Sequence, residues 1–175
     1  PVAVVRQCTK MMRAELEFLR ELRNIQQFRQ KFAADDTVHF PVPYPELCSR
    51  RVLTMERIEG VLVSQIKRLP ESNPEMDEFS RRGANMYLEM IFRDAFYHAD
   101  PHPGNLMLLP GGVVGVLDCG MVQRLGDDLR EAIEDLLLAA VHRDPHTVTE
   151  AVWGLCTAPP ATERQRLQSD ITALV

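Results

Sequence analysis

Five residues near the middle of the chain have the types and the spacing that phosphoryl-group chemistry requires. They lie in the stretch YHADPHPGNLMLLPGGVVGVLDCG, residues 97–120. They are His98, Asp100, His102, Asn105 and Asp118. Two prolines and a glycine exclude regular structure over residues 98–104, so the first four belong to one loop.

Two short apolar runs, LMLL and VVGVL, flank a Pro-Gly-Gly turn and predict a β-hairpin. A hairpin returns the chain close to its start, so Asp118 can approach Asn105. One amide oxygen and one carboxylate converging on a point suit Mg²⁺, a hard cation with oxygen ligands. Asp100 would then face a nucleophile, and this division of roles is the one that phosphoryl transfer uses.

The same spacing resembles the protein-kinase signature, in which H-R-D-L-x-x-x-N precedes D-F-G. His98-Ala99-Asp100 stands at the place of H-R-D, Asn105 has the required offset, and Asp118-Cys119-Gly120 stands at the place of D-F-G. Two simpler interpretations accompany this one. His98 is expected to hold the loop backbone, and Cys119 to be a small buried filler.

The elements that must position these residues are mainly helical. Hydrophobic periodicity and capping residues predict helices over residues 4–32, 74–97, 127–142 and 145–155, near 62, and from 162 onward. Alternation predicts a strand over residues 51–58. We therefore expect an α+β, predominantly helical fold, with residues 1–175 forming a single partial domain that divides into 1–60 and 61–175.

Composition limits the classes of function. The 175 residues are 45% hydrophobic and 26% charged with a net charge of −5, which indicates a globular protein and does not favour nucleic acid as a partner. Four cysteines without a CxxC pair favour a reducing compartment over a zinc ribbon or a redox centre. No apolar run is long enough for a transmembrane segment.

Three stretches resemble the UbiB/ADCK (aarF-type) family of atypical kinases: HADPHPGN, VLTMERIEG and AELEFLRELRN, all within residues 14–125. The resemblance implies a kinase-like C-lobe with an αC-like helix and a hinge strand. It implies binding of ATP and Mg²⁺, and ATPase activity more readily than protein phosphorylation. It also implies a link to ubiquinone and other isoprenoid lipids, with membrane lipid or lipid-biosynthesis enzymes as partners and peripheral membrane association.

Site residues follow from the same resemblance. Asp100 becomes the catalytic residue, Asn105 and Asp118 become the Mg²⁺ ligands, and Glu15 becomes the ion-pair partner of a strand lysine. The hinge that reads adenine through its backbone is expected at Met55, Glu56 and Ile58.

The sequence departs from the family pattern in several places. Glu17 stands where the E-x-D motif has Asp, and Cys119 stands where D-F-G has Phe. No K-x-G-Q segment, glycine-rich loop or strand lysine precedes Glu15. We therefore expect a fragment of a longer kinase-like protein, with a natural truncation of impaired catalysis as the alternative.

Two other functions are consistent with the residues alone. His98, Asp100 and His102 form an H-x-D-x-H set that could bind zinc in a hydrolase, although Pro101 and Pro103 spoil the regular strand that this would need. A pseudokinase-like module that docks a partner without turnover is the other alternative, and the missing lysine favours it for this chain.

Overall fold

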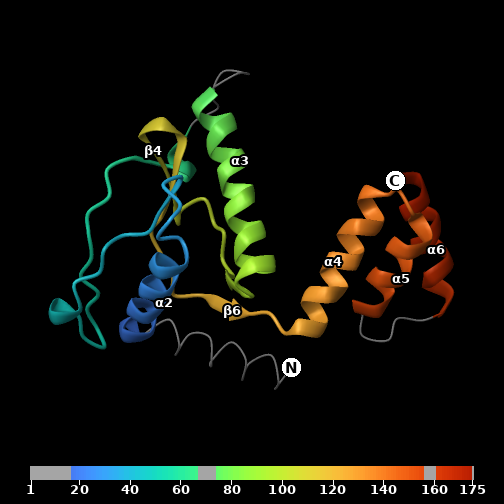
Figure 1. The fold of residues 1–175 in the computed structure, drawn as a ribbon, viewed down its shortest axis with the longest axis horizontal. Helices are drawn as coiled ribbons and strands as arrows, with labels where there is room; N and C mark the ends of the chain where they lie inside the picture. The colour runs from blue at the N-terminus through green and yellow to red at the C-terminus, as the bar shows by residue number, and fades with distance from the viewer. Residues whose placement is uncertain (1–16, 67–73, 156–160, 175) are drawn as a thin grey trace. The chain divides into compact units, whose positions relative to one another are not determined.

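The computed structural model describes residues 17–66, 74–155 and 161–174 (Figure 1). The chain folds as two compact units that divide between Gln123 and Arg124. The first contains every site residue proposed above except Glu15, which lies outside the described residues. Helices and a mixed sheet together confirm the expected α+β fold. The division expected at residue 60 stays a prediction.

Four strands form the main sheet of the first unit, in the order β1-β5-β4-β2. Their bounds are Val38–His39 for β1, Val61–Leu62 for β2, Leu106–Leu109 for β4 and Val113–Val116 for β5. The antiparallel β4–β5 pair, in register from Leu106 with Val116 to Leu109 with Val113, is the expected hairpin. Gly111 and Gly112 have φ of 75° and 73° in its turn, a conformation that other residues rarely adopt.

Two helices of the first unit pack on this framework (Figure 1). The described part of the first is α2, Phe18–Lys31; the second is α3, Pro74–Leu88. The predicted helix over residues 74–97 is too long, because the α-helical pattern ends at Leu88. A π-helical turn, η3 (Glu89–Arg93), follows it, and Ala95 at φ 47° turns the chain into β3, Phe96–His98.

The strand expected over residues 51–58 is absent, and only Val52 and Met55 form isolated bridges there. The facing segment explains this result. It contains Pro41, Pro43 and Pro45, which have no N–H to donate to a ladder. Three short 3₁₀ turns complete the unit: η1 (Pro45–Leu47), η2 (Val63–Gln65) and η4 (Pro110–Gly112). Residues 61–65 are therefore a short strand and a turn, and the helix expected near residue 62 is wrong.

The second unit is helical. It contains α4 (Asp127–Val141), α5 (Pro145–Leu155) and α6 (Ala161–Leu174), close to the ranges expected from the sequence. The helices enclose a small core of Ala139, Val148 and Ile171. In the part of the chain that the structure describes, no helix is both long and apolar enough to cross a membrane.

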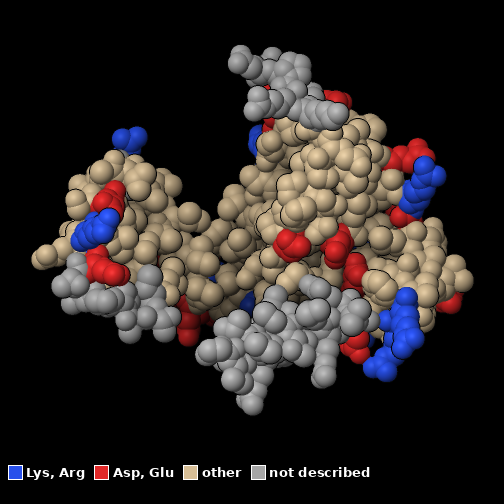
Figure 2. Space-filling view, turned by 180° about the vertical axis from the view of Figure 1, so that it is seen from behind, with Lys and Arg blue, Asp and Glu red and all other residues tan. Residues whose placement is uncertain are grey.

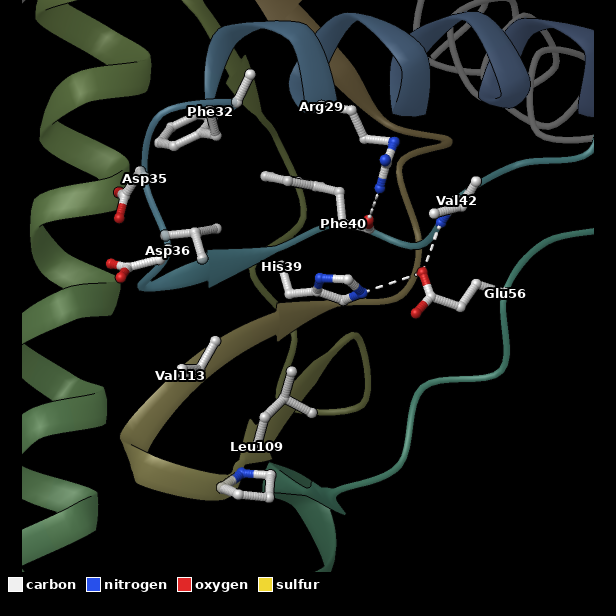
Figure 3. Close-up of a pocket in the computed structure, with 13 residues that line it drawn as sticks. Arg29, Phe32, Asp35, Asp36, His39, Phe40, Val42, Glu56, Leu109 and Val113 are labelled. Atoms are coloured by element: carbon white, nitrogen blue, oxygen red, sulfur yellow. Dashed lines mark hydrogen bonds and ion pairs between the residues drawn. The ribbon is translucent and has the colours of Figure 1, made fainter.

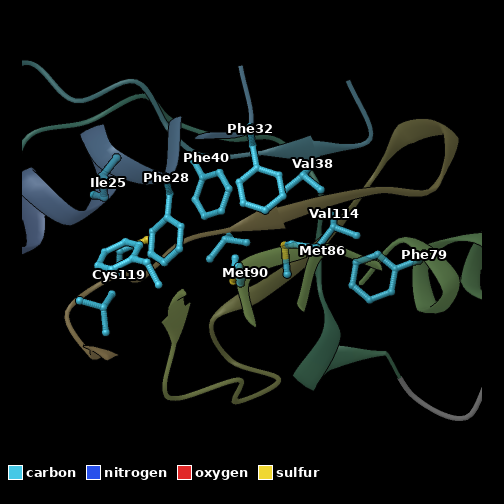
Figure 4. Close-up of a cluster of buried hydrophobic side chains, with 13 residues drawn as sticks. Ile25, Phe28, Phe32, Val38, Phe40, Phe79, Met86, Met90, Val114 and Cys119 are labelled. Carbon is cyan, nitrogen blue, oxygen red and sulfur yellow. The ribbon is translucent and has the colours of Figure 1, made fainter. Parts of the chain in front are cut away.

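The core of the first unit lies between α2, α3 and the main sheet, and aromatic rings fill its centre (Figure 4). Phe28 of α2 is fully buried and stacks on Phe40, with ring centroids 5.0 Å apart and an angle of 3° between the planes. It also contacts Phe96 of β3 at 4.7 Å. β3 leads directly into the loop at residues 98–105. The ring cluster therefore packs α2 against the strand that positions this loop.

Basic and acidic side chains are scattered among uncharged ones on the face drawn in Figure 2. The described residues therefore present no broad surface of one charge on that face.

Replacing Phe28 by Ala is expected to lower the free energy of unfolding by about 3–5 kcal/mol, because a large cavity would open beside two other rings. Urea unfolding followed by circular dichroism measures this change. Leu47→Ala, at a position that is 59% exposed, is the control and should change the free energy by less than about 0.5 kcal/mol. A loss below about 1 kcal/mol for Phe28→Ala would contradict the central place given to this ring.

Candidate active site

His98 joins the two halves of the candidate site. Its ring is 2% exposed, at the end of β3. The backbone N–H of Asp100 donates to His98 Nδ1 at 3.0 Å, so this nitrogen carries no proton. The proton is therefore on Nε2, which donates to the backbone oxygen of Asp118 at 2.5 Å. This geometry agrees with the structural role expected for His98.

Backbone hydrogen bonds fix the loop between Asp100 and Asn105. The N–H of His102 donates to Asp100 O at 2.7 Å, and the N–H of Asn105 donates to His102 O at 2.8 Å. The carbonyl of Asn105 then accepts from Leu117 N at 2.9 Å, directly before Asp118. The loop and the D-x-G turn therefore lie against each other, as the hairpin argument expects.

Asp100, Asn105 and Asp118 line one cavity of about 190 Å³. Asn105 Nδ2 lies 3.4 Å from Asp100 Oδ2, a long contact that a ligand can replace. Asp118 is oriented by Gly120, whose N–H donates to Asp118 Oδ1 at 2.7 Å. The remaining lining residues are Phe18, Glu21, His98, Gly120 and Met121.

Glu21 of α2 is a cavity residue that the sequence analysis did not identify. Its Oε1 accepts a hydrogen bond from Cys119 N at 3.3 Å. Burial and the charge of Asp118 raise the pKa of Glu21 to about 7. The carboxylates of Glu21 and Asp118 therefore lie close together. Among the described residues, no Lys or Arg contributes to the shift.

The donor set fits Mg²⁺ bound together with phosphate. Among the described residues, no three His, Cys, Asp or Glu side chains are grouped to hold a metal ion by themselves. Mg²⁺ does not require such a cage, because it keeps waters and binds through one or two carboxylates and substrate phosphates. Asp118 and the amide oxygen of Asn105 are ligands of the right type, and a cation beside Asp118 would also offset the negative charge that, together with burial, raises the pKa of Glu21.

A family model described as the ABC1 atypical kinase-like domain matches residues 1–152. The chain belongs to this family. Its fold also resembles that of Rv3197 from Mycobacterium tuberculosis, solved in complex with erythromycin, with a TM-score of 0.62 and 22% identity over 85% of this chain and 37% of that one.

Curated relatives of this ABC1 chain bear the name "Probable protein kinase UbiB". The protein from Pasteurella multocida is 36% identical over 155 residues, and the one from Photobacterium profundum is 37% identical over 156. Each alignment covers 86% of this chain, and the chain spans less than a third of the length of these relatives.

The three residues expected at the hinge do not line the cavity that contains Asp100, Asn105 and Asp118. Glu56 lines a larger cavity of about 640 Å³ between the end of α2, β1 and the β4–β5 turn (Figure 3). Its carboxylate accepts from Val42 N at 2.9 Å and lies 3.1 Å from His39 Nε2. Met55 packs against the main core. The described walls of this cavity contain none of the residues predicted for catalysis or metal binding.

The zinc-hydrolase alternative receives no support from this geometry. Both ring nitrogens of His98 already bond to the backbone, and Nδ1 of His102 accepts from Gly104 N at 3.0 Å. His98 would have to break two hydrogen bonds and leave its buried position before it could bind a metal.

Glu21 could have been found from the helical pattern. It lies on the same stripe of α2 as Asn24, Ile25 and Phe28, all three of which are buried. Polar residues on a core stripe are unusual and require partners. A carboxylate on this stripe is therefore the signal by which the sequence indicates Glu21.

Tyr87 of α3 is a second residue that the sequence did not indicate. Its hydroxyl is buried and has no hydrogen-bond partner among the described residues. Burial and the charge of Asp100 raise the pKa of Tyr87 to about 12. The neutral hydroxyl therefore lies near Asp100 without a hydrogen bond to any described residue.

The pH dependence of stability should reveal Glu21. Because its pKa is higher in the folded state, folding binds a proton, and this contribution is complete below pH 4.5 and lost as the pH rises through 7. Without divalent ions, the wild type should therefore lose stability relative to Glu21→Gln as the pH rises through this range. Urea unfolding of both proteins at several pH values measures the difference. Parallel curves would show that Glu21 does not carry this shift.

Tyr87→Phe should raise the free energy of unfolding by about 1 kcal/mol, because a buried hydroxyl without a partner is costly. Tyr44→Phe is the matched control at a position that is 40% exposed, where little change is expected. Thermal and urea unfolding measure both variants. A loss of stability in Tyr87→Phe would mean that the hydroxyl has a partner after all.

Proposed function

We propose that this chain is the core of a UbiB-type atypical kinase, which binds ATP with Mg²⁺ and hydrolyses it or transfers the γ-phosphoryl group. The observation that carries the proposal is the convergence of Asp100, Asn105 and Asp118 on one cavity. His98 fixes the relative position of their two motifs through the backbone. Membership of the ABC1 family supports the same class of reaction.

Each residue has a distinct role in this proposal. Asp100 accepts a hydrogen bond from the attacking hydroxyl or water and orients it toward the phosphorus. Asn105 and Asp118 would hold Mg²⁺ through oxygen atoms. The metal supplies charge neutralisation at the phosphate oxygens when it is bound. Nothing in this division requires covalent chemistry on the protein, so positioning and charge are the main contributions.

The hinge remains the proposed adenine site. The N–H of Glu56 already donates to Val42 O at 2.7 Å. Adenine would therefore meet the carbonyl of Glu56 and the N–H of Ile58, while Met55 would line the base from the core side. The side chain of Glu56 takes part in the contacts to Val42 and His39 and holds this segment in place.

A binding module without turnover is the second candidate, and one observation favours it for this chain. The groups that shift the pKa of Glu21 include no Lys or Arg from the described part of the chain. A kinase uses a lysine paired with a helix glutamate to hold the phosphates. Glu15 stays the predicted partner of such a lysine, and Glu21 is now a second carboxylate suited to this role.

The proposal also covers the partners of the protein and its cellular setting. We propose a link to ubiquinone or another isoprenoid lipid, with lipid or lipid-biosynthesis enzymes as partners, as the resemblance to the UbiB/ADCK family implies. We propose a reducing compartment with peripheral membrane association. Vesicle co-sedimentation tests the last point.

Thermal unfolding of the chain with MgADP, and with ADP alone, tests the binding site. A ligand present at a hundred times its dissociation constant adds about 2.7 kcal/mol to the stability of the folded state, or a few degrees in Tm for a chain of this size. We expect the shift to depend on Mg²⁺ and to disappear in Asp118→Asn, because the variant loses a charged ligand.

Asp170→Asn provides the control, since Asp170 is exposed on α6, and it should keep the full shift. A shift in the wild type that does not need the metal would contradict the assignment of Asp118. An ATPase assay on the same samples separates the two candidates: binding without turnover favours the docking module, and turnover that is lost in Asp100→Asn favours the enzyme.

A further inference from the structure

The backbone of Cys119, the middle residue of the D-x-G turn, is held on both sides by α2. Glu21 Oε1 accepts from Cys119 N at 3.3 Å, and Asn24 Nδ2 donates to Cys119 O at 2.7 Å. Glu21 and Asn24 are three residues apart and therefore lie on the same face of the helix. Asn24 is 7% exposed and Cys119 is fully buried, so water does not replace these contacts easily.

These bonds affect Asp118 because it directly precedes Cys119. Its own carbonyl is fixed by His98, and its carboxylate is turned by Gly120 N. The contact from Asn24 fixes the next carbonyl along the chain, that of Cys119 itself. With this carbonyl held, the dihedral angles of Cys119 cannot change freely, and the direction of the Asp118 side chain is restricted from both sides.

We propose that Asn24 is a positioning residue for Asp118, which holds the D-x-G turn to α2 in the orientation that binds the metal. This inference rests on the proposed function. Asn24 touches neither the metal nor the nucleotide and acts only through the backbone of Cys119. It makes metal binding depend on the position of α2.

Contacts that do not involve Asn24 also hold α2 in place. The effect of Asn24 on the turn can therefore be measured apart from the packing of the helix. Ile25 and Phe28 are fully buried on the same stripe of the helix. Near the other end of the helix, Arg29 donates to Phe40 O at 2.6 Å and Lys31 pairs with Asp94 at 3.2 Å. The helix should therefore stay in place without Asn24, and the loss should fall on the turn, where a buried carbonyl loses its donor.

Asn24→Leu tests the proposal in the full chain, with Arg29→Met as the matched control. Arg29 lies on the same helix and also donates to a backbone carbonyl, but on Phe40. The first readout is hydrogen–deuterium exchange of peptides that cover residues 118–121, without ligand. We expect exchange at least tenfold faster in Asn24→Leu and unchanged in Arg29→Met.

The second readout is the affinity for Mn²⁺ in the presence of saturating ADP, measured by electron paramagnetic resonance well below Tm. Asn24→Leu should weaken Mn²⁺ binding at least tenfold and leave the affinity for ADP without metal unchanged. A loss of structure would change both affinities, whereas a positioning role changes only the first. Should Asn24→Leu fail to fold, Asn24→Ser serves instead, since its side chain stops one atom short of the contact.

The outcomes are distinguishable. Unchanged exchange at residues 118–121 in Asn24→Leu overturns the inference, whatever the nucleotide does. Faster exchange with unchanged Mn²⁺ affinity overturns the link to the metal. If the wild type binds neither ADP nor Mn²⁺, the proposed function fails and the metal role of Asn24 fails with it. Faster exchange together with selective loss of Mn²⁺ affinity supports the proposal.

Discussion

The close approach of three acidic side chains is the constraint on which the rest of this structure depends. Glu21, Asp100 and Asp118 line the same small cavity. The pKa of Glu21 rises because burial and the charge of Asp118 both disfavour a second negative charge. Repulsion between these carboxylates destabilises the protein without a ligand, and a bound cation would offset that repulsion. The fold must therefore supply the free energy that keeps these carboxylates together.

Apolar packing and backbone hydrogen bonds supply it. The rings of Phe28, Phe40 and Phe96 bring α2 and β3 together at centroid distances of 5.0 and 4.7 Å. β3 ends at His98, whose neutral ring bonds to the backbone on both sides of the site. A neutral imidazole adds no charge of its own, so it can fix the two motifs without cancelling the field that would attract a metal.

The approach of the loop at residues 98–105 to the D-x-G turn could be predicted because their spacing in the sequence is local. Asp100 and Asn105 share one short loop, and a hairpin with a Pro-Gly-Gly turn returns the chain to Asp118, so few other arrangements are possible. Helix positions in the second unit followed from periodicity for the same reason. Their apolar spacing needs no distant partner to be recognised.

Features that depend on distant partners were missed. The strand over residues 51–58 failed because its neighbour is rich in proline, and the long helix ended at Leu88 because a π-turn and Ala95 redirect the chain into β3. Glu21 and Asn24 both contact the backbone of Cys119, which lies 98 and 95 residues away. Periodicity places these two side chains on a helix face but cannot say which backbone they will meet.

Cys119 has only a short side chain at the place where Glu21 and Asn24 contact the D-x-G turn. The thiol is fully buried, as expected of a small filler, and burial together with Glu21 and Asp118 raises its pKa well above the usual range. It therefore stays protonated and adds no further negative charge to the site. A phenylalanine here, as in D-F-G, would need more space beside α2, where protein interiors are closely packed. With cysteine at this position, Glu21 and Asn24 hydrogen-bond to the peptide groups on both sides, so the helix holds the turn through its backbone.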